Sequence, residues 1–159
     1  MKILGIDPGY GRIGWGIIDY SKRKAKYIAC DCITTSKNSP FNDRLLTVFK
    51  AITDVIKKQK VEEIAVESLF FNTNQKTAIL ASHARGVIVL AGVMSGLPVF
   101  DYTPLQVKQA LIGYGRADKK QVQAILKFHL QTEEVFKQDD AADAVAVALT
   151  HAYTNRRLI

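Results

Sequence analysis

Hydrophobic and polar residues alternate along the first part of the chain in the way that β-strands require. Apolar runs over residues 2–7, 12–20 and 27–35 are separated by a Pro-Gly turn and by a basic turn. Period-two alternation between such turns is typical of strands joined as hairpins. The pattern therefore predicts three antiparallel strands, the first of which ends at Asp7.

Helical periodicity follows the third strand. Apolar residues recur at three- and four-residue spacing up to about residue 60, which predicts an amphipathic helix with Ser39 as its N-cap and Pro40 at the first helical position. Two short apolar runs, 63–67 and 98–103, predict a strand parallel to the first and a last strand. The expected fold is α/β, with a mixed five-stranded sheet whose three antiparallel strands come first, flanked by helices.

The segment 76–95 is predicted to be a helix with apolar residues on more than one face. Such a helix either lies deep in a core or is shared with another subunit. The sequence leaves both alternatives open, and it favours a homodimer seam because small residues, Ala84 and Gly86 among them, would allow a close approach.

Three more helices are predicted towards the C-terminus. A short one opens at Pro104 and carries Lys108, and the next carries Lys119 and Lys120. The glycine-flanked turn between them could hold a phosphate backbone, although a solvated helix hairpin has the same charge pattern. The last helix, which ends near residue 154, is rich in alanine and can therefore lie close to the sheet.

Length and composition narrow the class of protein. The 159 residues suit a single domain spanning 1–159, and 48% hydrophobic with 23% charged residues is a globular composition. No apolar run approaches the ~20 residues of a membrane span, and the start lacks a signal-peptide layout, so a cytoplasmic protein without a membrane partner is expected. Cys30 and Cys32, two apart in one predicted strand, are expected to be reduced packing residues.

The charge balance points to a polyanionic partner. The chain carries 22 Lys and Arg against 15 Asp and Glu, a net charge of +7, and a basic surface favours nucleic acid. This evidence is weak alone, because many unrelated small proteins are basic. The positions of a few acids make it more specific.

Two of these acids end predicted strands that lie in parallel. Asp7 closes the first strand and Glu67 closes the run 63–67, so the two carboxylates are expected side by side. An isolated Asp before Pro-Gly is more often a simple turn former. A carboxylate at the tip of a central strand is nevertheless costly to desolvate without a cation or a hydrogen bond, and the remaining acids favour a cation.

Further acids share one face of the last helix. Asp140 and Asp143 are three apart near its N-terminal end, and Asp139 would also share a face with Asp143. The first acid of the helix has an alternative role as N-cap, whereas Asp143 has none. Four converging carboxylates are favourable only with divalent metal, and all-oxygen ligands favour Mg²⁺ or Mn²⁺ over zinc. Two such ions could support phosphodiester hydrolysis.

Five motifs follow one another along the chain. They are GIDPG at 5–9, VESLF at 66–70, ARG at 84–86, VKQALIGYGRADKKQV at 107–122 and DAADAVAVALTH at 140–151. In this order and combination they resemble the bacterial RuvC family of Holliday-junction resolvases over nearly the whole chain. The resemblance implies an RNase H-like fold, a homodimer, and symmetric paired incision of four-way DNA junctions with Mg²⁺.

The resemblance also implies roles for individual residues. The expected metal ligands and catalytic acids are Asp7, Glu67, Asp140 and Asp143, which settles Asp140 over Asp139. They would hold two Mg²⁺ per active site, with Mn²⁺ as a substitute. The expected catalytic lysines are Lys108 and Lys119. The expected DNA-binding residues are Phe70, as a base-stacking aromatic, Asn74, Arg85, Arg116 and Lys120. The RuvA–RuvB branch-migration complex is an expected partner, and His83 stands where the family is expected to have glutamine.

Other classes of protein share parts of this pattern. Residues 5–18 also resemble the first phosphate loop of actin-like ATPases and sugar kinases, but those need a second lobe and a second glycine-rich loop, which the sequence lacks. A non-catalytic junction-binding module would be favoured if one acid were missing, and all four are present. An RNase H that cuts RNA–DNA hybrids would use similar acids, and substrate tests separate it from a resolvase.

Overall fold

One mixed sheet forms the centre of the molecule. The computed structural model describes residues 1–69, 75–112, 119–132, 136 and 138–155, and at residues 75, 76, 119 and 120 it describes the backbone alone. The strand order is β3-β2-β1-β4-β5, with β1 antiparallel to β2 and parallel to β4. The strands are β1 (Lys2–Asp7), β2 (Arg12–Ser21), β3 (Lys24–Thr34), β4 (Glu63–Glu67) and β5 (Val99–Tyr102). The predicted RNase H-like sheet, with three antiparallel strands first, is confirmed.

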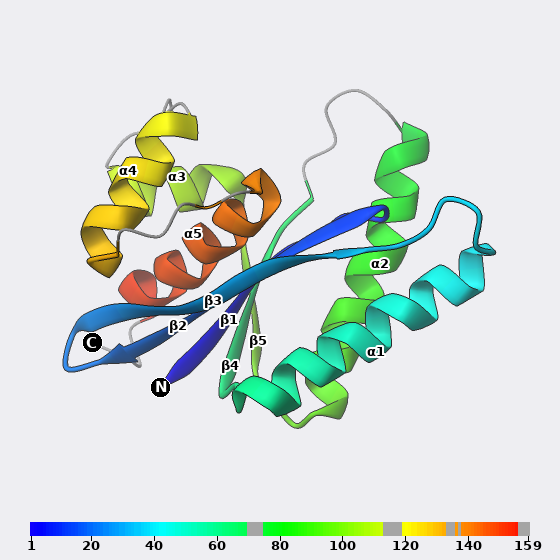
Figure 1. Cartoon of the computed structure of the whole chain (residues 1–159), viewed down its shortest axis with the longest axis horizontal. Helices are drawn as coiled ribbons and strands as arrows, with labels where there is room; N and C mark the ends of the chain where they lie inside the picture. The colour runs from blue at the N-terminus through cyan, green and yellow to red at the C-terminus, as the bar shows by residue number, and fades with distance from the viewer. Residues whose placement is uncertain (70–74, 113–118, 133–135, 137, 156–159) are drawn as a thin grey trace.

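Helices cover both faces of the sheet (Figure 1). On one face lie α1 (Phe41–Gln59) and α2 (Gln75–Met94). On the other lie α3 (Pro104–Ile112), α4 (Lys119–Leu130) and α5 (Asp139–Thr154). Each predicted helix is present, so the periodicity of the sequence was sufficient to locate the elements.

Two element boundaries differ from the prediction. The helix expected to begin at Pro40 begins at Phe41, because Pro40 keeps an extended ψ of 151° and takes the N-cap position expected for Ser39. The third strand begins at Lys24, earlier than expected, because the turn before it is confined to Lys22 and Arg23, which adopt positive φ values of 49° and 62°. The basic run that the sequence predicted to be a turn is therefore a two-residue turn, and the residues after it pair with β2 as part of β3.

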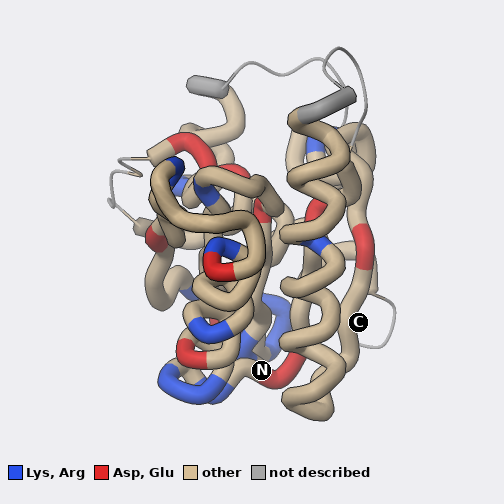
Figure 2. Tube along the Cα trace, turned by 90° about the vertical axis from the view of Figure 1, so that its right-hand side faces the viewer, with Lys and Arg blue, Asp and Glu red and all other residues tan. Residues whose placement is uncertain are grey.

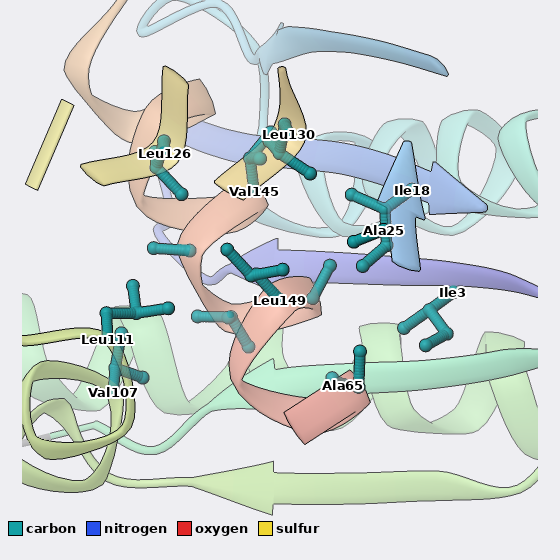
Figure 3. Close-up of a cluster of buried hydrophobic side chains, with 14 of the residues drawn as sticks. Ile3, Ile18, Ala25, Ala65, Val107, Leu111, Leu126, Leu130, Val145 and Leu149 are labelled. Atoms are coloured by element: carbon teal, nitrogen blue, oxygen red, sulfur yellow. The ribbon is translucent and has the colours of Figure 1, made fainter. Parts of the chain in front are cut away.

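The two faces of the sheet carry separate hydrophobic clusters. One cluster joins β1 and β2 to α3, α4 and α5 on the sheet face that these helices cover. Figure 3 shows Ile3 and Ile18 of the sheet opposite Leu126, Leu130 and Leu149 of the helices. The other cluster packs β1, β2 and β4 against α1 and α2. Each helical layer is thereby fixed to the sheet independently.

The backbone of helix α5 packs directly against the backbone of the sheet. A Cβ atom at Gly5 would stand 2.0 Å from the carbonyl oxygen of Ala144, and one at Gly14 would stand 1.9 Å from the carbonyl oxygen of Asp140. At Gly16 an added Cβ would lie 2.9 Å from the backbone nitrogen of Val145. Real side chains cannot approach backbone so closely, so these three glycines determine how deeply the helix sits.

A buried histidine fixes the C-terminal half of α5. His151 is fully buried, with Nε2 2.6 Å from Oε2 of Glu63 and Nδ1 2.7 Å from the hydroxyl of Tyr102. Burial lowers the pKa of His151, although the neighbouring Glu63 opposes the shift. A neutral imidazole can donate from Nε2 to the carboxylate and accept the Tyr102 proton at Nδ1, so both strands β4 and β5 are tied to the helix.

Helix α2 packs on one side only. Its inward residues are Ala81, Ala84, Ile88 and Ala91, whereas Ile79, Leu90, Val93 and Met94 are more than half exposed. Residues 77–94 are long and apolar enough to cross a membrane by length and composition alone, contrary to the sequence-based expectation, and 22% of this stretch is buried. Length and composition are weak evidence for a span. The packing of α2 against α1 and β5 shows that one of its faces belongs to the fold.

Substituting Gly5 by alanine tests the close approach of α5. The added methyl group would meet helix backbone, so Gly5→Ala should lower the free energy of unfolding by roughly 2 kcal/mol or more, in the upper part of the range for overpacked cores. Gly11→Ala is the control, because its added Cβ would lie 3.7 Å from Arg44 Nη2 in ordinary contact. Urea unfolding of both variants measures the effect, and equal stability would contradict this account of α5.

Candidate active site

Two carboxylates meet where neighbouring parallel strands end. Asp7 is the last residue of β1 and Glu67 the last of β4, and the ladder pairs Ile6 with Val66 immediately before them. The side chains of Asp7 and Glu67 share a hydrogen bond. A hydrogen bond between two carboxyl groups needs a proton on one of them.

Helix α5 brings a third carboxylate to the same place. Asp143 lies close enough to Glu67 for its charge to act on it, and the charge of Lys108 of α3 acts on Glu67 with the opposite sign. The close approach of α5 to Gly5 and Gly14 makes this meeting possible, because a bulkier sheet surface would hold the helix further out. Four predicted site residues, Asp7, Glu67, Asp143 and Lys108, are therefore brought together.

The proton affinity of Glu67 reflects this crowding. Burial, then the charge of Asp7, their hydrogen bond and the charge of Asp143 together raise the pKa of Glu67 to about 8, and Lys108 acts in the opposite direction. Glu67 is therefore largely protonated at neutral pH in the metal-free protein. A divalent cation among these oxygens would favour the charged form and displace that proton.

Asp140 stands on the flank of this group. Its Oδ2 lies 3.6 Å from Nη1 of Arg12, and its charge acts on the thiol of Cys32. Burial, followed by the Asp140 charge, raises the pKa of Cys32 to about 11. The thiol therefore stays protonated, and the carboxylates remain the hard oxygen donors of the site.

The donor set fits a hard divalent ion. Carboxylate oxygens are the ligands preferred by Mg²⁺ and Mn²⁺, and charge repulsion among these acids is what such an ion would relieve. Among the residues that the structure describes, no three Asp, Glu, His or Cys side chains already stand in a ligand geometry. Asp7 and Glu67 are instead linked by a hydrogen bond, and Asp140 is paired with Arg12.

The other predicted site residues either lie on helix α2 or fall outside the described part of the chain. Arg85 of α2 pairs through Nη2 with Oδ1 of Asp101 on β5, on the sheet face that carries α1 and α2. His83 is exposed, with its ring 5.3 Å from that of Phe41. Phe70, Asn74 and Arg116 lie outside the described residues, as do the side chains of Lys119 and Lys120 at the start of α4.

Sequence reasoning missed two charged residues, one at the acidic site and one at the opposite end of β4. Arg12 shares a strand face with Gly14, which lies directly beneath Asp140, so alternation along β2 would have placed it at the site. Glu63 likewise shares a strand face with Glu67, yet it pairs with His151 at the far end of β4. Strand alternation was a usable signal for both, whereas their partners depend on where α5 lies.

Known proteins match this chain over nearly its full length. The profile of the family described as "Crossover junction endodeoxyribonuclease RuvC" matches residues 3–151. The protein of that name from Clostridioides difficile is 49% identical over 156 residues, covering 98% of this chain and 92% of the relative. Its counterpart from Caldanaerobacter subterraneus is 46% identical over 158 residues, covering 99% and 96%.

Solved structures agree with the sequence comparison. Thermus thermophilus RuvC in complex with Holliday junction substrate superposes with a TM-score of 0.92 at 34% identity, over 99% of this chain and 96% of that one. The structure of Thermus thermophilus RuvC gives a TM-score of 0.88 at 33% identity. Sequence and fold lead to the same family, and the chain belongs to the RuvC family of crossover junction endodeoxyribonucleases.

Proposed function

We propose that the protein is a metal-dependent endonuclease that resolves four-way DNA junctions by paired, symmetric incision during recombination and repair. One observation carries this proposal. Asp7 and Glu67, at the ends of the central strands β1 and β4, lie close to Asp143, and Asp140 lies beside them. The membership of the chain in the RuvC family supports the junction as substrate, and a relative at 34% identity has been seen with a Holliday junction.

The four acids are the proposed ligands for two Mg²⁺ ions, with Mn²⁺ as a substitute. Ions bound there would supply the charge that activates a water molecule and stabilises the leaving oxygen of a phosphodiester. The chain's own part is to place oxygens from two strands and one helix around a common point and to release the proton shared by Asp7 and Glu67. Lys108, which acts on Glu67, would offset negative charge that develops on the DNA.

DNA binding beyond the acids is proposed for residues expected from the sequence. They are Phe70, Asn74, Arg85, Arg116, Lys119 and Lys120. Phe70 would stack on a base unpaired at the crossover, and the cations would contact phosphates. Release of the described ion pair with Asp101 would be needed for Arg85 to do so.

A homodimer is proposed on the basis of the exposed face of α2. Figure 2 shows α2 with few charged residues beside the charged helix α1, and Ile79, Leu90, Val93 and Met94 of α2 are exposed. Two copies joined there would supply two active sites for two incisions. The RuvA–RuvB complex is proposed as the partner that presents the junction, in the cytoplasm where bacterial DNA lies.

Removing one carboxylate charge tests the assignment of the site. Asp7→Asn, and separately Asp143→Asn, should reduce cleavage of a mobile four-way junction more than about a hundredfold, comparable with the loss of other preorganised charges. Junction affinity in gel-shift assays should be retained, because the basic surface is unchanged. The assay uses Mg²⁺ with the junction, a linear duplex and an RNA–DNA hybrid.

The control for these variants is Asp139→Asn, which removes an acid from the same helix turn and should leave cleavage near the wild-type rate. Normal cutting by Asp7→Asn would contradict the metal site. Preference of the wild-type protein for the hybrid over the junction would replace the resolvase with an RNase H activity.

The titration of Glu67 predicts how stability of the metal-free protein depends on pH. Between the unperturbed pKa of 4.5 and the folded-state pKa of about 8, the folded protein keeps a proton that the unfolded chain has released. Stability should therefore fall as pH rises through this window in the presence of EDTA. His151 has a lowered pKa and contributes an opposite slope below pH 6.5, so variants must be compared.

Glu67→Gln should therefore have a shallower decline of melting temperature between about pH 5 and pH 8 than the wild-type protein. Asp54→Asn, at an exposed position on α1, controls for removal of one negative charge and should keep the wild-type slope. Identical slopes in all three proteins would mean that Glu67 does not hold the proton.

Substituting one exposed leucine tests the dimer. Leu90→Glu places a charge in the proposed seam and should give a monomer in sedimentation velocity, because a buried unpaired charge opposes association. Leu46→Glu on α1 is the matched control, since Leu46 is 49% exposed and Leu90 51%. The monomer should nick one strand without paired cutting. A dimer that survives Leu90→Glu would place the seam elsewhere.

A further inference from the structure

Arg12 occupies a rigid position at the edge of the acidic site. It is the first residue of β2, where it pairs with Thr34 of β3, so its backbone belongs to the sheet ladder. Its side chain shares a strand face with Gly14 and Gly16, the face covered by α5. The guanidinium reaches Asp140, with Nη1 3.6 Å from Oδ2.

The Arg12–Asp140 pair is exposed and therefore easily exchanged. The side chain of Arg12 is 58% exposed and that of Asp140 36%. An exposed ion pair contributes little to folding stability, because water screens it and ordering a long side chain opposes it. Since this ion pair contributes little to folding, we looked for its role in the binding of metal or DNA at the neighbouring proposed ligands.

The chemistry of the guanidinium suits two successive partners. Its planar donors match a carboxylate and a phosphate equally well. Four carboxylates would repel the phosphates of a DNA strand unless cations stand between them. Lys108 acts on the Glu67 side of the group, and Arg12 stands at the Asp140 side.

We propose that Arg12 is a substrate-binding residue that exchanges partners. In the metal-free protein it neutralises Asp140, and once Asp140 ligates a divalent ion the freed guanidinium binds a phosphate of the DNA strand that enters the site. This inference rests on the proposed junction-resolving function. Metal binding and DNA binding are thereby coupled through one side chain.

A double-mutant cycle on DNA affinity tests the exchange. The four proteins are wild type, Arg12→Gln, Asp140→Asn and the double variant, each measured as a full chain with a fluorescent four-way junction, once with EDTA and once with Ca²⁺ as a probe ion that need not support cleavage. With EDTA, Arg12→Gln should match wild type, because Asp140 occupies the guanidinium. Asp140→Asn should bind up to about fivefold more tightly, and the double variant should lose that gain.

With Ca²⁺, Arg12→Gln should bind the junction about tenfold more weakly than wild type, and the slope of log affinity against log salt should fall by about one. Lys24→Gln, at the start of β3 by the opposite end of the β2–β3 hairpin, removes the same charge and should leave the Ca²⁺ response intact. Circular dichroism melting of each variant excludes a folding defect.

Two outcomes would overturn the exchange. Equal weakening by Arg12→Gln with EDTA and with Ca²⁺ would make Arg12 a permanent DNA contact, and an additive cycle with no change on Asp140→Asn would make the ion pair incidental. Failure of the wild-type protein to prefer the junction over linear duplex would instead reject the proposed function itself. The two failures are therefore distinguishable in one set of titrations.

Discussion

The contact of α5 with the glycine-lined sheet is the constraint on which the rest of the site depends. Gly5, Gly14 and Gly16 leave the sheet without side chains where the helix crosses it, and the backbone of α5 occupies that space. A helix held at the usual distance by larger side chains would carry Asp143 away from the ends of β1 and β4. Packing at the core therefore determines the distances among the acids. A methyl group added at one of these glycines would disturb both the packing of α5 and the positions of the acids.

Strand β4 shows how position decides the chemistry of identical side chains. Glu63 and Glu67 share one face of the strand, at opposite ends. Glu63 meets His151, a neutral donor that satisfies it, and so anchors the helix. Glu67 meets Asp7 and Asp143, which repel its charge and raise its pKa. One end of α5 is thus a stable anchor, and the other presents carboxylates that gain from a cation.

Much of this arrangement follows from sequence periodicity. Two short apolar runs that each end in an acid predicted Asp7 and Glu67 at neighbouring strand ends, and three-residue spacing predicted Asp140 and Asp143 on one helical face. The sequence did not reveal that Asp140 pairs with Arg12 of β2, because that contact depends on how α5 crosses the sheet. The Arg85–Asp101 pair was missed for a similar reason, since it joins α2 to β5 across a non-local contact.

Two groups of the protein offset the negative charge that these carboxylates concentrate. A proton shared by Asp7 and Glu67 removes one charge, and the guanidinium of Arg12 offsets another at Asp140. Under the proposed function, a cation held by all four carboxylates would displace both the proton and the guanidinium, so its binding would depend on pH. The two displaced groups differ in their fate. Under the proposed exchange, the proton would leave to solvent, whereas the guanidinium, held on β2, would remain beside the acids and would bind a phosphate of the entering strand.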